Sequence, residues 1–354
     1  MRIHRILRAG VALAFGVASA LRLAPFAPAF SGVLTPYPAL VPLAAFVQAA
    51  VLDLDRAAAP GRTLLDELRA MRDAAHVNAI SVYGLETCDA TGSNIRKDAL
   101  LAGVRTLRLK LIVRLDAYDP TSFAFTTADL DWIFERYGPL LRYLATPDHR
   151  DLVAYVALNM PVDDPAVQQR LGGINSALSR QRQPAYAAAF VERFRRTMGQ
   201  DGYPGAVAYL GVTYGWDDSY DLPSYAAAQP DGYYLTNYSY PEGAVADEHA
   251  TVPVLLNQPR LQAVVDHFQR QYGTAPVVVE YGFHTVAYDG TAPTQSAGLV
   301  ATYAAKQKAL PATTAYYRGA VPSVVGTSYF GYNVFKPEGD PAVLLDWALE
   351  YPPG

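Results

Sequence analysis

A carboxylate at the end of an apolar run is the clearest chemical signal in the sequence. Residues 277–279 are all valine, and they lead directly into Glu280 and Tyr281. A continuous β-branched run is typical of a strand buried on both faces, as in a parallel sheet. Barrel enzymes place their chemistry at the carboxyl ends of such strands. Glu280 is therefore a candidate catalytic residue. The alternative is a structural glutamate that pairs with an arginine and holds a loop.

The residues that follow the other apolar runs are mostly acidic or aromatic. They are Asp53, Tyr83, Glu86, Arg114, Asp116, Asn159, Asp163, Asp164, Tyr214, Trp216, Asp217, Asp218, Tyr238, Tyr240 and Tyr329. The six histidines are dispersed along the chain, which argues against a His-ligated metal site. Lys110 begins an apolar run, at the wrong end for a Schiff base. The sequence also has no Gly-rich phosphate loop, so we expect no metal or organic cofactor.

Carboxylate chemistry fits what is left, and glycoside cleavage is one such reaction. That reaction needs two carboxyl groups on either side of the scissile bond. One protonates the leaving oxygen, and the other attacks the anomeric carbon or activates water. Aromatic faces stack on sugar rings, and hydroxyl and amide groups bind sugar hydroxyls. The strand ends carry these residue types.

Strands and helices alternate along the chain from about residue 45. The predicted strands are 45–52, 77–83, 109–115, 151–158, 206–212, 232–238, 275–280 and 321–330. Predicted helices begin at Thr63 and cover 95–107, 127–144, 185–198, 223–228, 258–272, 293–310 and 341–349. Eight such units predict an α/β fold with a single closed (β/α)8 barrel. An open doubly wound sheet is the alternative, but its Gly-rich first turn is missing at residues 53–56.

The N-terminal segment has the pattern of a secretory signal peptide. Arg2, Arg5 and Arg8 precede an apolar run over 11–20, which is too short to span a bilayer and ends in Ala-Ser-Ala. We predict a signal peptide at 1–20, a linker at 21–43 and the barrel at 44–354. The protein would then be secreted or periplasmic, with no stable membrane insertion after cleavage. An uncleaved N-terminal anchor is the alternative.

The overall composition excludes several other classes of protein. Of the 354 residues, 51% are hydrophobic and 18% charged, so a large core is expected and global disorder is not. The net charge of -4 comes without a basic block, which argues against a nucleic-acid partner. The single cysteine, Cys88, has no partner for an internal disulfide.

Three segments resemble the clan A glycoside hydrolases. Residues 77–83 are similar to the second strand of that clan, residues 277–283 to its seventh and residues 324–332 to its eighth. The resemblance implies a retaining mechanism with Glu280 as the nucleophile, hydrogen bonded by Tyr238 or Tyr240. It also implies that Asn159 precedes the acid/base position. The chain departs from the pattern there, because that position is Met160, which has no proton to give.

Three interpretations of Met160 are open. Asp163 or Asp164 reaches back to act as the acid, although an Asp before Pro165 also suits a helix cap. Another loop supplies the acid, with Glu86, Asp116 and Asp217 as candidates. In the third interpretation the chain has lost hydrolysis and only binds glycan.

We therefore predict an exported glycoside hydrolase or transglycosylase that acts on a β-linked polysaccharide or a surface glycan. Its catalytic residues would be Glu280 with Asp163 or Asp164. The predicted substrate-binding residues are Asn159, Tyr83, Trp216, Tyr238, Tyr240, Tyr281 and Tyr329. Trp216 and Asn159 also suit plain loop roles, and Arg114 is expected to be an ion-pair partner. The alternatives are a non-catalytic glycan-binding barrel and a barrel enzyme of another reaction type.

Overall fold

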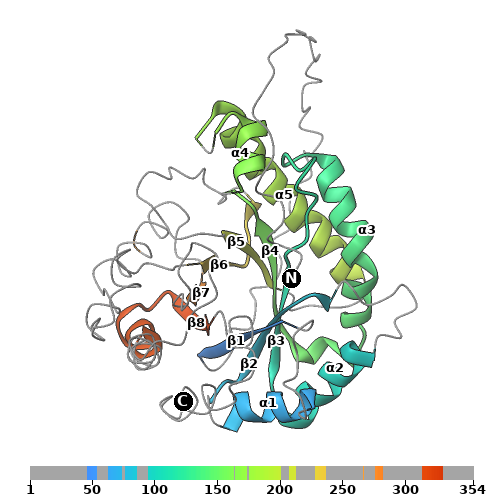
Figure 1. The fold of residues 1–354 in the computed structure, drawn as a ribbon, viewed down its shortest axis with the longest axis vertical. Helices are drawn as coiled ribbons and strands as arrows, with labels where there is room; N and C mark the ends of the chain where they lie inside the picture. The colour runs from blue at the N-terminus through green and yellow to red at the C-terminus, as the bar shows by residue number, and fades with distance from the viewer. Residues whose placement is uncertain are drawn as a thin grey trace, which may run out of the picture. The chain divides into compact units, whose positions relative to one another are not determined.

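Eight parallel strands form a closed barrel in the order β1 to β8, with β8 paired back to β1. The computed structural model describes residues 46–53, 63–73, 76–85, 95–162, 164–173, 175–200, 207–212, 228–236, 266, 276–281 and 313–329. The strands are β1 (Val47–Asp53), β2 (Ala79–Tyr83), β3 (Lys110–Leu115), β4 (Val153–Met160), β5 (Val207–Val212), β6 (Gly232–Thr236), β7 (Val277–Tyr281) and β8 (Val324–Tyr329). Figure 1 labels all eight. The predicted (β/α)8 barrel is confirmed.

Side chains along each strand alternate between the barrel interior and the surrounding helices, because successive residues of a strand point to opposite faces. The interior holds a small apolar cluster that includes Ala49, Ala79, Ile112, Tyr155 and Val278. The large core lies outside it, between strands and helices. A close approach of β8 to β1 completes the ring. A Cβ added to Gly326 would lie 2.7 Å from the Cβ of Val47, so a glycine fits this position best.

The described helices cover the outside of the barrel. They are α1 (Leu64–Asp73), α2 (Ile95–Leu107), α3 (Thr127–Leu144), α4 (Pro165–Leu171) and α5 (Ala177–Gln200), with a 3-10 turn, η3 (Arg150–Leu152), and a further helix at 313–320. Helix α1 packs on α2, and α3 packs on α5, as Figure 1 shows. All of these elements belong to one compact unit, Leu40–Gly354.

Two helix starts follow from local side-chain chemistry. Helix α3 begins with a capping box in which the Thr126 hydroxyl and the Asp129 carboxylate satisfy each other's backbone N–H groups. Helix α1 also begins with such an exchange, between Thr63 and Asp66 rather than the neighbouring Glu67. A capping box needs its acidic residue three positions after the cap, and Asp66 is at that spacing. Glu67 instead lies buried.

Several predicted boundaries were wrong. Strand β4 continues through Asn159 and Met160, which pair with Gly211 and Val212 of β5, whereas a loop was expected from Asn159. Helix α5 begins at Ala177, eight residues before the predicted start, and contains Pro184. The helices α4 and 313–320 were not predicted. Pairing with a neighbouring strand and packing against the barrel extend these elements beyond what local patterns indicate.

Other predictions fall outside the described residues. These are the leader and linker at 1–43, Cys88, the helices at 293–310 and 341–349, and most of the helices at 223–228 and 258–272. Among the helices that the structure describes, none is both long enough and apolar enough to cross a membrane.

Candidate active site

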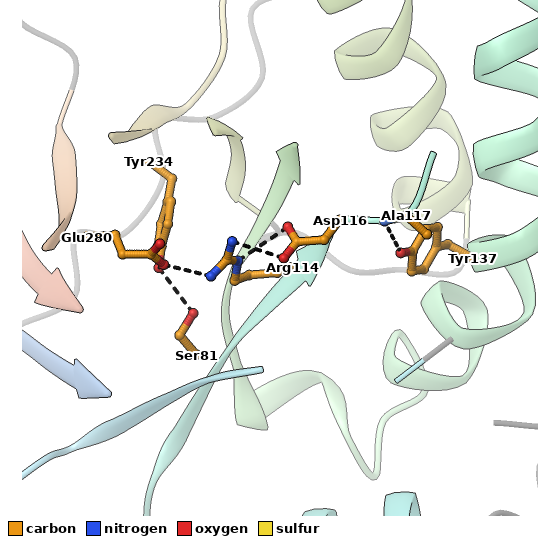
Figure 2. Close-up of polar contacts among 7 residues, drawn as sticks. All are labelled: Ser81, Arg114, Asp116, Ala117, Tyr137, Tyr234 and Glu280. Carbon is orange, nitrogen blue, oxygen red and sulfur yellow. Dashed lines mark hydrogen bonds and ion pairs between the residues drawn. The ribbon is translucent and has the colours of Figure 1, made fainter. Parts of the chain in front are cut away.

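Glu280 lies near the carboxyl end of β7, with its side chain inside the barrel. Its Oε2 atom accepts a hydrogen bond from Arg114 Nη1 at 2.7 Å and another from the hydroxyl of Tyr234. Only 1% of the Glu280 side chain is exposed, and 8% of Arg114. Figure 2 shows Arg114 extending between Glu280 and Asp116. The expectation that Arg114 is an ion-pair partner is confirmed, and so is the pairing of Glu280 with an arginine.

The local sequence explains why these long polar side chains fit inside a barrel. Each of them occupies an inward position of its strand, where a two-residue period places it. Small residues, including Ala49, Ala79 and Ala157, belong to the cluster inside the barrel, and Ala157 pairs with Arg114. Their short side chains leave space for the Tyr234 ring and for Arg114, whose Cζ atom lies 5.7 Å from the centre of that ring. Barrel interiors are normally packed solid, so this space is filled by the polar cluster.

Tyr234 connects Glu280 to the opposite side of the barrel. Its hydroxyl donates to Glu280 and lies 3.2 Å from the Ser81 hydroxyl on β2. Burial raises the pKa of Tyr234 well above its usual value of 10, and the negative charge of Glu280 raises it further. The phenol therefore stays neutral and acts as a hydrogen-bond donor.

Asp116 follows β3 and contacts the other edge of Arg114. Arg114 Nη2 lies 2.9 Å from Asp116 Oδ2, and Arg114 Nε donates to Oδ1 at 3.3 Å. The Asp116 side chain is 26% exposed, far more than Glu280. Burial raises the pKa of Asp116 above its usual 3.8, although the charge and hydrogen bonds of Arg114 oppose that rise. One guanidinium thus joins a buried carboxylate and a partly exposed carboxyl group.

The loop that carries Asp116 is tied to its surroundings by hydrogen bonds. The backbone N–H of Ala117 donates to the Tyr137 hydroxyl of α3 at 2.8 Å. The hydroxyl of Tyr118 donates to Asp164 at 2.7 Å. Arg170 of α4 donates to the carbonyl oxygens of Pro120 at 2.7 Å and Phe123 at 2.9 Å. These contacts fix the backbone on which Asp116 sits.

Asp164, a predicted catalytic residue, is the N-cap of α4. Its Oδ1 atom accepts from the backbone N–H groups of Ala166 and Val167, and its Oδ2 atom accepts from Tyr118. A helix cap was the predicted alternative to a catalytic role for this residue. Asp163 lies outside the described residues.

Two predicted sugar contacts, Tyr281 and Tyr329, face the helices rather than the barrel interior. The Tyr281 hydroxyl lies 2.7 Å from that of Thr314, which belongs to the helix at 313–320, and its ring packs near Tyr329. Because Glu280 points inward, the next residue along the strand must point outward. The structure therefore does not bring these two tyrosines to Glu280, and for Tyr281 the alternation along β7 would have indicated this.

The residues at the end of β4 also lie on opposite faces. Asn159 is half-buried and shares the inward face with Ala157. Met160 is fully buried, with 0% exposure, in the core between barrel and helices. Met160 thus fills an apolar site on the helix side of its strand.

The side chains of the remaining predicted site residues lie outside the described part of the chain. Tyr83 ends β2, but its side chain is outside the described set, and so are Trp216, Tyr238, Tyr240, Glu86 and Asp217. Tyr234 was missed as the tyrosine that contacts Glu280. The signal was available, because an inward tyrosine on β6, the strand beside β7, has the length to reach an inward acid near the end of β7. In the described part of the chain, no three His, Cys, Asp or Glu residues gather into a metal-binding group.

Comparisons with known proteins support the fold. No protein-family model matches the chain. No curated protein matches it either. Among solved structures, a glycoside hydrolase family 5 enzyme from Prevotella bryantii is similar with a TM-score of 0.54 and 15% identity, covering 87% of this chain and 96% of that one.

Two further structures show the same likeness. A broad-specificity endoglucanase from Clostridium longisporum has a TM-score of 0.54 and 13% identity, over 86% of this chain and 95% of that one. An endo-β-mannanase/endo-β-glucanase from Prevotella bryantii has a TM-score of 0.52 and 15% identity, over 86% of this chain and 48% of that one. The predicted resemblance to glycoside hydrolase barrels is thus confirmed at the level of the fold.

Proposed function

We propose that this protein is a glycoside hydrolase or transglycosylase that acts on a polysaccharide or a surface glycan through a retaining mechanism. Glu280 is the nucleophile. The observation that carries the proposal is the position of its carboxylate, near the carboxyl end of β7 and held by Arg114 Nη1 at 2.7 Å and by the Tyr234 hydroxyl. Barrel enzymes assemble their active sites at this end of the strands.

The two partners prepare Glu280 for attack on an anomeric carbon. The positive charge of Arg114 favours the ionised carboxylate, which is the nucleophilic form. The neutral hydroxyl of Tyr234 fixes the orientation of the same oxygen atom. A carboxylate fixed in this way forms a glycosyl-enzyme ester, which water or an acceptor sugar then cleaves.

The substrate is a carbohydrate, and we assign its binding to residues at the ends of the strands. Asn159 lies on the inward face of β4, where an amide can bond a sugar hydroxyl. Tyr83, Trp216, Tyr238 and Tyr240 are proposed as the stacking and hydroxyl-binding residues of the loops.

We also propose that the chain is exported, on the basis of the charged and apolar pattern of residues 1–20. Mass spectrometry of the N-terminus after expression in a bacterial host tests this.

A polysaccharide screen tests the enzymatic activity. Purified protein is incubated with β-glucan, β-mannan and xyloglucan, and new reducing ends are measured. Wild type should cleave at least one polymer, and Glu280→Gln should lower turnover by a factor of at least 10³. Glu192→Gln is the matched control. It removes the same charge as Glu280→Gln, but from a helix-surface residue that pairs with Arg196. Turnover that survives in Glu280→Gln would contradict the assigned role.

A second candidate function is glycan binding without hydrolysis. In it, the ion pair between Arg114 and Glu280, of which the Glu280 side chain is 1% exposed, has only a structural role. In that case wild type and Glu280→Gln would bind a polysaccharide with similar affinity, and neither would release reducing ends.

A further inference from the structure

Two carboxyl groups share a single guanidinium at the mouth of the barrel. Arg114 contacts Glu280 through Nη1 and Asp116 through Nη2 and Nε, as Figure 2 shows. Because hydrogen bonds join both groups to one planar cation, their nearest oxygen atoms lie within about 8 Å of each other. Paired carboxyl groups are about 5–5.5 Å apart in retaining glycosidases and about 6.5–9.5 Å apart in inverting ones, and the limit of about 8 Å includes the retaining separation. The Glu280–Asp116 pair is therefore close enough to act on a single glycosidic bond.

The charge balance favours one proton on this pair. Arg114 neutralises one carboxylate, so among the described groups a second ionised carboxylate would leave a net negative charge in a largely buried site. Glu280 receives both the Arg114 and the Tyr234 hydrogen bonds at one oxygen, which suits the ionised form. The raised pKa of Asp116 agrees with a proton on the other member of the pair.

We propose that Asp116 is the proton donor of the glycoside cleavage, in place of the residue missing at position 160. This inference rests on the proposed function of Glu280. In the first step the Asp116 carboxyl gives its proton to the glycosidic oxygen, and Glu280 forms a bond to the anomeric carbon as the bond to that oxygen breaks. In the second step the Asp116 carboxylate takes a proton from water, and the oxygen of that water displaces Glu280.

The exposure of Asp116 and the hydrogen bonds that hold its loop both fit the role of proton donor. The Asp116 side chain is 26% exposed, so a substrate can reach it, and its Oδ1 atom makes a long 3.3 Å contact with Arg114 Nε. The following residues, Ala117 and Tyr118, are held by Tyr137 and Asp164. A proton donor needs such a fixed backbone to keep its distance from the reacting oxygen.

Neighbouring described carboxylates suit the role less well. Both oxygens of Asp164 are occupied by helix-cap and Tyr118 hydrogen bonds. Asp119 accepts hydrogen bonds from Thr121 and Ser122, which lower its pKa to about 2 and leave it ionised at neutral pH. An ionised carboxylate has no proton to donate.

Kinetics with two kinds of leaving group test the assignment. The full chain carrying Asp116→Asn is assayed on the polysaccharide found in the screen and on the 2,4-dinitrophenyl glycoside of the same sugar. Because dinitrophenolate leaves without protonation, kcat/KM should fall at least 100-fold on the polysaccharide and by less than tenfold on the aryl glycoside. Sodium azide should restore turnover of the aryl glycoside and give a glycosyl azide. The loss of activity that we expect of wild type at alkaline pH should disappear in Asp116→Asn.

Two further variants keep the test decisive. Asp131→Asn is the matched control, since Asp131 forms a surface ion pair with Arg193 on the outside of α3. If Asp116→Asn does not fold, Asp116→Glu keeps a carboxyl group and should shift the alkaline limb of the pH profile. Equal losses on both substrates, or an unchanged alkaline limb in Asp116→Glu, would overturn the assignment of Asp116.

The outcome also separates this inference from the proposed function. Activity that Glu280→Gln abolishes and Asp116→Asn leaves intact on the polysaccharide would keep the function and reject the proton donor. A wild type that cleaves no polymer in the screen would reject both.

Discussion

Arg114 Nη1 lies 2.7 Å from Glu280 Oε2 and thereby joins β3 to β7 across the barrel. Both side chains are almost entirely buried. Taking two charges out of water is costly, and their attraction compensates for that cost only while both partners are present. Loss of one partner should therefore destabilise the fold by more than the intact pair stabilises it.

Arg114→Met should lower the free energy of unfolding by about 3–5 kcal/mol, because it leaves the Glu280 carboxylate buried without its cation. Urea denaturation followed by circular dichroism measures this. The double variant Arg114→Met/Glu280→Gln should be more stable than Arg114→Met alone, since the unpaired charge is gone. Strict additivity of the two single changes would show that the residues do not interact.

Tyr234→Phe should lower the free energy of unfolding by about 1.5–3 kcal/mol at pH 7, because the hydroxyl donates to an ionised group. Tyr143→Phe is the control, since the Tyr143 hydroxyl makes an exposed, 3.3 Å bond to Asp98. Tyr143→Phe should cost much less.

Titration of Tyr234 should also make stability depend on alkaline pH. The pKa of Tyr234 is raised well above 10 in the folded chain, so above pH 10 the unfolded chain loses this proton first. The contribution of Tyr234 is complete below pH 10, and stability falls as the pH rises from there. The slope of unfolding free energy against pH above 10 should be steeper in wild type than in Tyr234→Phe. Identical slopes would contradict the raised pKa.

Much of the barrel could be predicted from the sequence, because runs and repeats of apolar residues and the residues that cap helices are local signals. The run of valines before Glu280 and the Thr126–Asp129 capping box give β7 and α3 within two residues at each end. The end of β4 could not be predicted in this way. Asn159 and Met160 are in a strand because Gly211 and Val212 lie beside them, and pairing between distant segments leaves no local pattern.

The centre of the candidate site could be predicted, and its partners only in part: an ion pair was expected of Arg114, but no contact was expected between Tyr234 and Glu280. Glu280 was found from its place after an apolar run, and its position was confirmed near the carboxyl end of β7. Tyr234 was not predicted, because its contact with Glu280 comes from an inward side chain within a strand rather than from a loop residue after it. That Arg114 bridges Glu280 and Asp116 depends on the reach of one side chain across the barrel, which strand spacing alone does not specify.

Asp164→Ala should lower the free energy of unfolding by about 0.5–2 kcal/mol through loss of the α4 cap. Asp164→Asn should recover most of that loss, because asparagine is an equally good N-cap. Thermal unfolding of both variants checks this. If Asp164→Asn matched Asp164→Ala in stability, the cap would not explain the effect. A fall in kcat in Asp164→Asn without a change in stability would instead support Asp164 as a proton donor.

Gly326→Ala should weaken closure of the barrel between β8 and β1. The added Cβ would lie 2.7 Å from the Cβ of Val47 and 2.8 Å from its carbonyl oxygen, and the backbone atom cannot move aside without breaking strand pairing. Such overpacking costs about 1–3 kcal/mol. Gly319→Ala is the control, because the new Cβ meets nothing within 4 Å and helix 313–320 favours alanine over glycine. Urea midpoints should therefore move in opposite directions, downward for Gly326→Ala and upward for Gly319→Ala. A Gly326→Ala protein as stable as wild type would show that β8 and β1 are not in such close contact.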